Sequence, residues 1–89
     1  MFFDWDARKA AANLKKHGVS FSEASEVFGD ELSSCVLDPD NSLGEARFLM
    51  FGTTLAGSTL VVSFTEESDT VRIISARRMT AAERKAYER

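Results

Sequence analysis

The sequence lacks the residue patterns that mark disulfide-rich, membrane-spanning and secreted proteins. It has a single cysteine, Cys35, so an internal disulfide framework is excluded and a reducing compartment is the simplest setting. No apolar run approaches the roughly 20 residues that a membrane-spanning helix needs. A secretory signal has a basic segment ahead of its apolar residues, and residues 1–6 have none. We therefore expect a small cytoplasmic domain that does not enter a membrane.

Motifs for bound cofactors are also missing. The sequence has no glycine-rich phosphate loop, no Ser–His–Asp spacing and no cluster of metal ligands. Histidine occurs once, as His17. We expect neither a metal ion nor a nucleotide cofactor.

What is present is a chain of the size and composition of one folded domain. It has 89 residues, of which 44% are hydrophobic and 28% charged, so we expect a single domain over residues 1–89. The net charge of −3 is unevenly spread: residues 18–45 have seven acidic side chains and no basic one, whereas residues 71–89 have six basic and two acidic. Residues 1–17 are also net basic. If the two ends of the chain lie side by side in the fold, they form a basic face although the net charge is negative. The acidic middle could equally be a docking surface for a basic partner.

Capping patterns predict three helices. Asp4 or Asp6 can accept hydrogen bonds from the first backbone N–H groups of a helix that ends at Gly18. Residues 20–23, Ser-Phe-Ser-Glu, form a capping box for a second helix. Residues 80–83, Thr-Ala-Ala-Glu, repeat that spacing at the start of a C-terminal helix.

Between the second and third helices the hydrophobic period becomes that of β-strands. The predicted strands, with a brief one at the N-terminus, are residues 2–5, 33–37, 46–53, 59–65 and 71–77. Short connections between consecutive strands favour antiparallel pairing. The expected fold is α+β: an antiparallel sheet of three to five strands, with two N-terminal helices and one C-terminal helix.

The last predicted strand carries more arginines than packing needs. Arginine keeps its charge and binds phosphate with two parallel hydrogen bonds, so it suits a site that holds an anion. Strict alternation along the strand places Arg72 and Arg78 on one face and Arg77 on the other, unless a bulge or twist intervenes. Arg47, which opens an earlier strand, could converge with Arg77. The alternative is that these arginines pair with nearby carboxylates or face water.

Other single residues have two interpretations each. His17 is a candidate acid or base, or a cation at the end of a helix. Trp5 could stack on a base, but a lone tryptophan beside apolar residues is more often part of a core. Cys35 lies in an apolar strand and is expected to be a buried small side chain.

Several blocks of the sequence occur in a combination that is specific, although each alone would be weak. They are Phe3-Asp4-Trp5-Asp6, Asn13-Leu14-Lys15-Lys16-His17-Gly18-Val19-Ser20-Phe21, Gly44-Glu45-Ala46-Arg47-Phe48, Leu60-Val61-Val62, Arg72-Ile73-Ile74-Ser75-Ala76-Arg77, and Glu83-Arg84-Lys85 with Tyr87. In these blocks, and over nearly its whole length, the chain resembles the BrnT toxin family, RelE-like ribonucleases of bacterial toxin–antitoxin systems.

The resemblance implies a RelE-like α+β fold and an endoribonuclease that halts translation. A cognate antitoxin with a ribbon–helix–helix DNA-binding domain would neutralise it, so that DNA is contacted only through the antitoxin. Cleavage would proceed without a metal ion, by attack of the RNA 2′-hydroxyl on the phosphate. A degenerate toxin that only binds its antitoxin, as a non-catalytic module, is the alternative.

The candidate site residues follow from the arginine pattern and the resemblance together. The candidate catalytic residues are Arg47, Arg77, His17, Lys16 and Glu45, and the candidate RNA-binding residues are Arg72, Arg78, Lys15 and Tyr87. We expect the arginines to hold the scissile phosphate, one of the residues near the end of the first helix to transfer protons, and Glu45 to orient an arginine.

Overall fold

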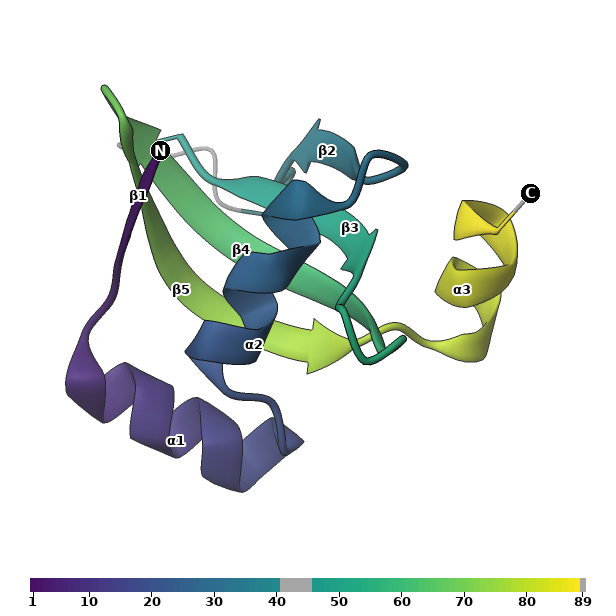
Figure 1. Ribbon diagram of the computed structural model, residues 1–89, viewed down its shortest axis with the longest axis horizontal. Coiled ribbons are helices and arrows are strands. Elements are labelled where there is room, and N and C mark those ends of the chain that lie inside the picture. Colours follow the sequence, from purple (N-terminus) through teal and green to yellow (C-terminus); the bar gives the residue numbers. More distant parts are fainter. Residues whose placement is uncertain (41–45, 89) are drawn as a thin grey trace.

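The computed structural model describes residues 1–40 and 46–88. Its elements, in chain order, are β1 (Phe2–Asp4), α1 (Ala7–His17), α2 (Phe21–Ser25), the 3-10 helix η1 (Glu26–Gly29), β2 (Ser34–Leu37), β3 (Phe48–Thr53), β4 (Thr59–Glu67), β5 (Thr70–Arg78) and α3 (Ala81–Tyr87) (Figure 1). The architecture is α+β, as the sequence predicts.

Local hydrogen bonds set the helix ends. Asp6 caps α1 by accepting hydrogen bonds from two backbone N–H groups, and Gly18 ends the helix in the left-handed conformation, with φ of 70°. Ser20 and Thr80 each form a complete capping box, at the starts of α2 and α3. Short-range sequence signals thus position the helices before any tertiary contact is considered.

The sheet is mixed, and this corrects the expectation of an antiparallel sheet. Within the described residues it has five strands in the order β1-β5-β4-β3-β2. The β2–β3, β3–β4 and β4–β5 pairs are antiparallel, but β1 runs parallel to β5, with Phe3 opposite Val71. Because α1 and α2 separate β1 from the meander, β1 can join the free edge of β5 in the parallel direction.

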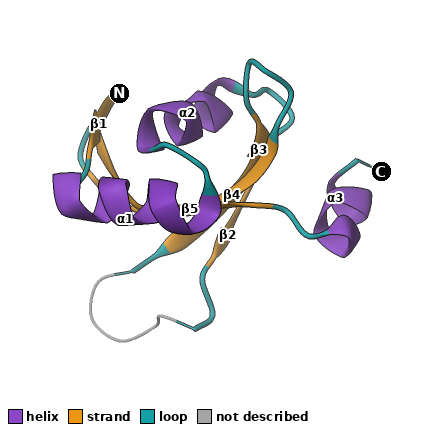
Figure 2. Ribbon diagram, turned by 90° about the horizontal axis from the view of Figure 1, so that it is seen from below, coloured by secondary structure: helices purple, strands orange, loops and turns teal. Residues whose placement is uncertain are grey.

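Helices α1 and α2 lie on one side of the sheet, whereas α3 stands beyond the end of β5 (Figures 1 and 2). The core lies between these two helices and the sheet, and its buried members are Val19, Phe21, Ala24, Val27, Leu60, Val62, Phe64, Val71, Ile73 and Ala76. Trp5 packs edge-on against Phe21, with ring centroids 6.0 Å apart, so it is partly buried beside the core rather than free to stack on a base.

Two further observations concern the surface. Cys35 is exposed, and the expectation of a buried cysteine is wrong, because it lies on β2, an edge strand whose residues are all exposed. Among the residues that the structure describes, no helix has the length and apolar character needed to cross a membrane.

Candidate functional site

A β-bulge in β5 decides which side of the sheet each arginine occupies. Ile73 and Ser75 pair with consecutive residues of β4, so Ile74 is an extra residue in β5. The alternation of side chains is reversed across this bulge. Ile73 and Ala76 both lie in the core, although strict alternation would place them on opposite faces.

Arg72 and Arg77 therefore lie on the same side of the sheet, opposite α1 and α2. We call this side the open face. Strict alternation predicts different faces for these two arginines, and that prediction is wrong because of the bulge. Cross-strand partners share a face, so the register adds Leu49 and Phe51 of β3 and Val61, Ser63 and Thr65 of β4 to the open face.

Arg47 lies on the open face by the same alternation, one residue before the core-facing Phe48 of β3. Extending the register by one residue brings it level with Thr65, and Thr65 pairs with Arg72. Arg77 pairs instead with Val61, four residues away along β4, which corresponds to about 13 Å at roughly 3.3 Å per residue. The register therefore places Arg47 nearer the level of Arg72, and the convergence of Arg47 with Arg77 stays a prediction.

Each arginine on the open face has a defined environment. Arg72 forms an ion pair with Asp4, its register partner on β1, and both side chains are about half exposed. Arg47 is half-buried, and its backbone carbonyl accepts a hydrogen bond of 2.8 Å from the backbone N–H of Asp38. Glu45, a candidate catalytic residue, lies outside the described residues.

Arg77 is bound by the first turn of α3. Its two terminal nitrogens donate to the two carboxylate oxygens of Glu83, at 2.8 and 3.0 Å. These hydrogen bonds raise the pKa of Arg77 and lower the pKa of Glu83 from 4.5 to about 2. Glu83 also accepts from the N–H of Thr80, so the capping box of α3 and the ion pair share one carboxylate.

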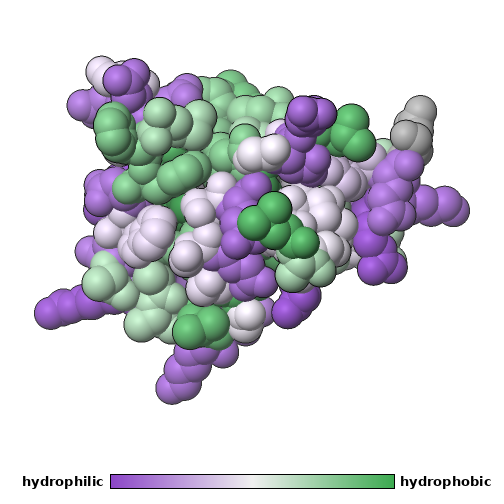
Figure 3. Space-filling model, in the orientation of Figure 1, coloured by the Kyte–Doolittle hydropathy of each residue, from purple (hydrophilic) through white to green (hydrophobic). Residues whose placement is uncertain are grey.

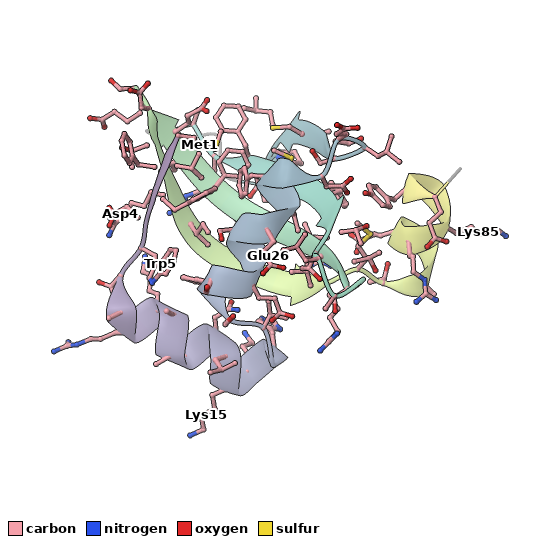
Figure 4. All side chains as sticks on the ribbon, in the orientation of Figure 1. Met1, Asp4, Trp5, Lys15, Glu26 and Lys85 are labelled. Carbon is pink, nitrogen blue, oxygen red and sulfur yellow. The ribbon has the colours of Figure 1, made fainter. Side chains whose placement is uncertain are left out.

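The remaining basic candidates lie on the helix-bearing side. Arg78 pairs in register with the core residue Leu60, so it shares that side and is exposed. Lys15, Lys16 and His17 form the last turn of α1, and Lys15 points away from the body of the protein (Figure 4). The structure thus divides the candidates into an open-face set, Arg47, Arg72 and Arg77, and a helix-side set, Lys15, Lys16, His17 and Arg78.

The hydroxyl of Tyr87 is engaged within the protein. It donates to Asp30 and lies 3.3 Å from the hydroxyl of Thr53. Burial raises the pKa of Tyr87, and the hydrogen bond to Asp30 adds to this effect. A tyrosine in this state keeps its proton at neutral pH, so it is poorly suited to act as a base, and its hydrogen bonds tie α3 to the end of β3.

Sequence reasoning missed the residues that hold the candidates in place. Asn13 bonds the backbone of Ala76, next to Arg77; Glu83 holds Arg77; and Asp30 holds Tyr87. Glu83 was visible in the sequence as the last residue of a capping box, but its second role depends on where α3 lies. Asn13 and Asp30 act over 63 and 57 residues, and no short-range pattern reports such contacts.

Within residues 1–40 and 46–88, no group of His, Cys, Asp and Glu side chains has the arrangement of a metal site. The open face carries guanidinium groups and hydroxyls, which bind anions by charge and by hydrogen bonds.

Comparison with known proteins assigns the family. The sequence model of the ribonuclease toxin BrnT of type II toxin–antitoxin systems matches residues 5–83. The chain belongs to the BrnT family. Membership makes it a ribonuclease toxin of a type II system and implies an antitoxin partner.

A solved BrnT structure has the same fold. The crystal structure of the Brucella abortus ribonuclease toxin BrnT is similar, with a TM-score of 0.65 and 21% sequence identity over 90% of this chain and 99% of that one. No significant match was found among curated proteins.

Proposed function

We propose that this BrnT-family toxin is an endoribonuclease that cleaves RNA on the open face of its sheet, without a metal ion, and thereby arrests translation. The observation that supports this most directly is the bulge at Ile74, which puts Arg72 and Arg77 on one face with Arg47. The side of the sheet opposite the helices, where Arg72 is exposed and Arg77 is partly exposed, also suits the RelE-like mechanism that the sequence suggests.

The chemistry needs positive charge more than any other property. The 2′-hydroxyl gives its proton to a base and bonds to the phosphorus, and the bond from phosphorus to the 5′-oxygen breaks as an acid protonates that oxygen. Negative charge accumulates on the non-bridging oxygens during this step, and fixed guanidinium groups stabilise it. Arg72 and Arg77 are five residues apart in sequence, and their partners on β4 are four residues apart because Ile74 is an extra residue. This spacing lets one arginine hold the scissile phosphate while the other holds a neighbouring one. The exposed hydroxyl of Ser75 lies between them and can donate to RNA.

RNA must displace Asp4 and Glu83 to reach these arginines. The side chains of the Arg72–Asp4 pair are 49% and 54% exposed, and those of the Arg77–Glu83 pair 42% and 27%. Ion pairs with this much solvent contact are worth about 0–1 kcal/mol. A phosphate can therefore replace either carboxylate at little cost, and the pairs hold the arginines extended until RNA binds.

Proton transfer is assigned to His17, Lys16 or Glu45. The first two lie on the helix-bearing side, so RNA that reached them from the open face would have to pass around the end of β5. Single substitutions separate the three: His17→Ala, Lys16→Ala and Glu45→Gln. The variant that removes one limb of the pH–rate profile identifies the acid or base.

The test is cleavage of RNA by the purified toxin, freed of antitoxin, in the presence of a chelator. Arg72→Ala and Arg77→Ala should each lower the cleavage rate about 100-fold or more, with Arg47→Ala similar. Arg78→Ala is the matched control, because Arg78 is next to Arg77 in sequence but lies on the other side of the sheet. The cleavage rate of this variant should change little. Melting temperatures measured in parallel should stay close to that of the unchanged protein.

Two results would overturn this proposal in different ways. Cleavage that is abolished by the chelator and restored by a divalent cation would contradict the metal-independent mechanism. Equal losses in Arg78→Ala and Arg77→Ala would contradict the assignment of the open face.

A second function is favoured by the ion pairs themselves. Arg72 and Arg77 are both neutralised by carboxylates of this chain, which suits a non-catalytic module that binds only its antitoxin. Such a module should show no RNA affinity even at low salt, where phosphate contacts are strongest. The antitoxin, which we propose carries a ribbon–helix–helix domain, would neutralise an active toxin or act as partner of an inactive one.

A further inference from the structure

The helix-bearing side of the molecule has a groove that the RNA-cleaving function does not use. It has a volume of about 840 Å³ and lies between β1, η1 and the turn that follows β3. Its apolar lining comes from Met1, Phe3, Phe28, Leu32 and Leu55. Figure 4 labels two residues that line it, Met1, which precedes β1, and Glu26, which begins η1.

The apolar side chains at the rim are unusually exposed. Leu55 is 90% exposed, Leu32 is 81% and Met1 is 72%. Figure 3 shows this face, where apolar side chains stand among strongly hydrophilic ones. Leucines that project from the rim of a hollow, within a polar surround, have the arrangement of a protein–protein interface.

The two rim leucines are held in place by acidic side chains. Glu26 accepts a hydrogen bond of 3.0 Å from the backbone N–H of Leu55, and Asp30 accepts one of 3.0 Å from the backbone N–H of Leu32. The exposed side chains therefore project from backbone that is already fixed. A partner that binds there has little ordering of these loops to bring about, which favours affinity.

The charge of the groove indicates what kind of partner it fits. Over the residues that the structure describes, its charged lining consists of Glu26, Asp30 and Glu31. An apolar groove whose charged lining is purely acidic attracts a segment with an apolar stripe flanked by lysine or arginine. It repels RNA, and it disfavours a second copy bound groove to groove, because a two-fold axis would place acid against acid.

We propose that this groove is a docking site for the antitoxin, occupied by an antitoxin segment that is apolar on one side and basic at its flanks. The proposal rests on the type II toxin function and deepens it by naming where the partner binds. The groove and the open face lie on opposite sides of the sheet. An antitoxin segment in the groove therefore does not itself cover the arginines, and only another part of the antitoxin could do so.

The experiment measures binding of the antitoxin, obtained by coexpression with this toxin, to purified toxin variants. The double variant Leu32→Asp with Leu55→Asp should raise the Kd at least 10-fold, and Glu31→Gln should weaken the salt dependence of binding. The matched control is Leu14→Asp, which changes a leucine of α1 that is 52% exposed and lies outside the groove. Its Kd should stay within about 2-fold of the unchanged protein.

Parallel assays keep this proposal separate from the nuclease function. Ribonuclease activity of each variant without antitoxin should be unchanged, and circular dichroism should show that the double variant is folded. If the toxin proves inactive on RNA but the groove variant still loses antitoxin, the docking site stands and the nuclease proposal fails.

Two outcomes would overturn the docking site. One is an unchanged Kd for the folded groove variant together with a raised Kd for Arg72→Ala or Arg77→Ala. This result would place the antitoxin on the open face. The other is a free toxin that sediments as a dimer and becomes monomeric in the groove variant, which would make a second copy the occupant.

Discussion

Asn13 shows how one buried side chain fixes the geometry next to the candidate site. Its amide donates to the carbonyls of Val19 and Ala76, at 2.9 and 2.8 Å, and accepts from the N–H of Ala76 at 3.1 Å. The parallel pairing of β1 ends at Arg72, so no strand of the described residues lies beside this edge of β5 at Ala76. The Asn13 amide takes the place of that strand by bonding both backbone groups of Ala76.

Replacing Asn13 by Ala should therefore lower the free energy of unfolding by about 3 kcal/mol, because three buried backbone groups lose their partners. The measurement is urea unfolding followed by circular dichroism. Lys9→Ala, on an exposed position of the same helix, is the control and should cost under about 0.5 kcal/mol. Equal midpoints for the two variants would show that water can replace the amide.

The sequence could not reveal these residue-scale roles. Asparagine inside a helix is usually unfavourable, so pattern analysis gives Asn13 no structural importance. The reversal of alternation at Ile74 is equally hidden, since the β5 sequence alternates well enough to suggest an unbroken strand. Both features depend on which strand lies beside β5, and that is a tertiary fact.

At the scale of the element, two contacts among the described residues hold α3, and in each the acceptor is a carboxylate whose pKa the contact lowers. Glu83 binds Arg77, and Tyr87 binds Asp30. The first contact depends on an ionised carboxylate whose pKa is lowered to about 2, so it stabilises the folded state above the ordinary value of 4.5 and is lost as the pH falls toward 2.

Glu83→Gln isolates that contribution, because glutamine keeps the capping-box position but removes the charge. At pH 7 the variant should be less stable by about 1 kcal/mol or less. The difference from the unchanged protein should shrink as the pH falls below about 4.5 and vanish near 2, as urea unfolding at several pH values would show. Thr80→Ala provides the contrast, since a lost cap costs about 1 kcal/mol without this dependence on pH. If the difference in unfolding free energy between Glu83→Gln and the unchanged protein stays constant over this pH range, the ion pair does not contribute to stability.

The contact between η1 and β3 depends on a glycine. A Cβ added to Gly52 would lie 2.9 Å from the Cβ of Val27 and 3.2 Å from its carbonyl oxygen. Gly52→Ala should therefore push η1 from the sheet and cost about 2 kcal/mol of unfolding free energy. In Gly29→Ala the added Cβ meets nothing within 4 Å, so this control should change stability by under about 0.5 kcal/mol. Thermal melts of the two variants measure the comparison, and equal shifts would contradict the steric explanation.

Elements were more predictable than their arrangement. The boxes at Ser20 and Thr80 lie within four residues of chain, so the starts of α2 and α3 follow from sequence alone. The parallel direction of β1 does not, because a three-residue strand carries no signal for a partner almost 70 residues away. The predicted division of the arginines between two faces was wrong because the bulge at Ile74 reverses the alternation, and no short-range pattern marks that bulge.

At the scale of the whole molecule, the open-face arginines and the groove carboxylates are sorted to different surfaces. The open face carries Arg47, Arg72 and Arg77, whereas the groove on the other side is lined by Glu26, Asp30 and Glu31. The net charge of −3 therefore conceals an arginine-bearing surface, paired in part with Asp4 and Glu83, and an acidic groove. The sequence predicted a basic face where its two ends meet, but Lys15 and Lys16 at the end of α1 lie on the helix-bearing side, apart from Arg72 and Arg77.

This sorting predicts how salt affects RNA binding. RNA with 2′-O-methyl groups binds but cannot attack its own phosphate, so affinity can be measured without cleavage, by fluorescence anisotropy over a range of salt concentrations. Each phosphate contact contributes about 0.7 to the slope of log K against log salt for single strands. Arg72→Ala and Arg77→Ala should each reduce the slope by roughly that amount.

The controls use the opposite side of the same molecule. Arg78→Ala and the groove variant Leu32→Asp with Leu55→Asp should leave the slope unchanged, since neither alters the open face. If Arg78→Ala lowers the slope as much as Arg77→Ala, RNA wraps the end of β5 and touches both sides of the sheet. The helix-side residues His17 and Lys16 would then lie on its path, and proton transfer from that side would become the favoured mechanism.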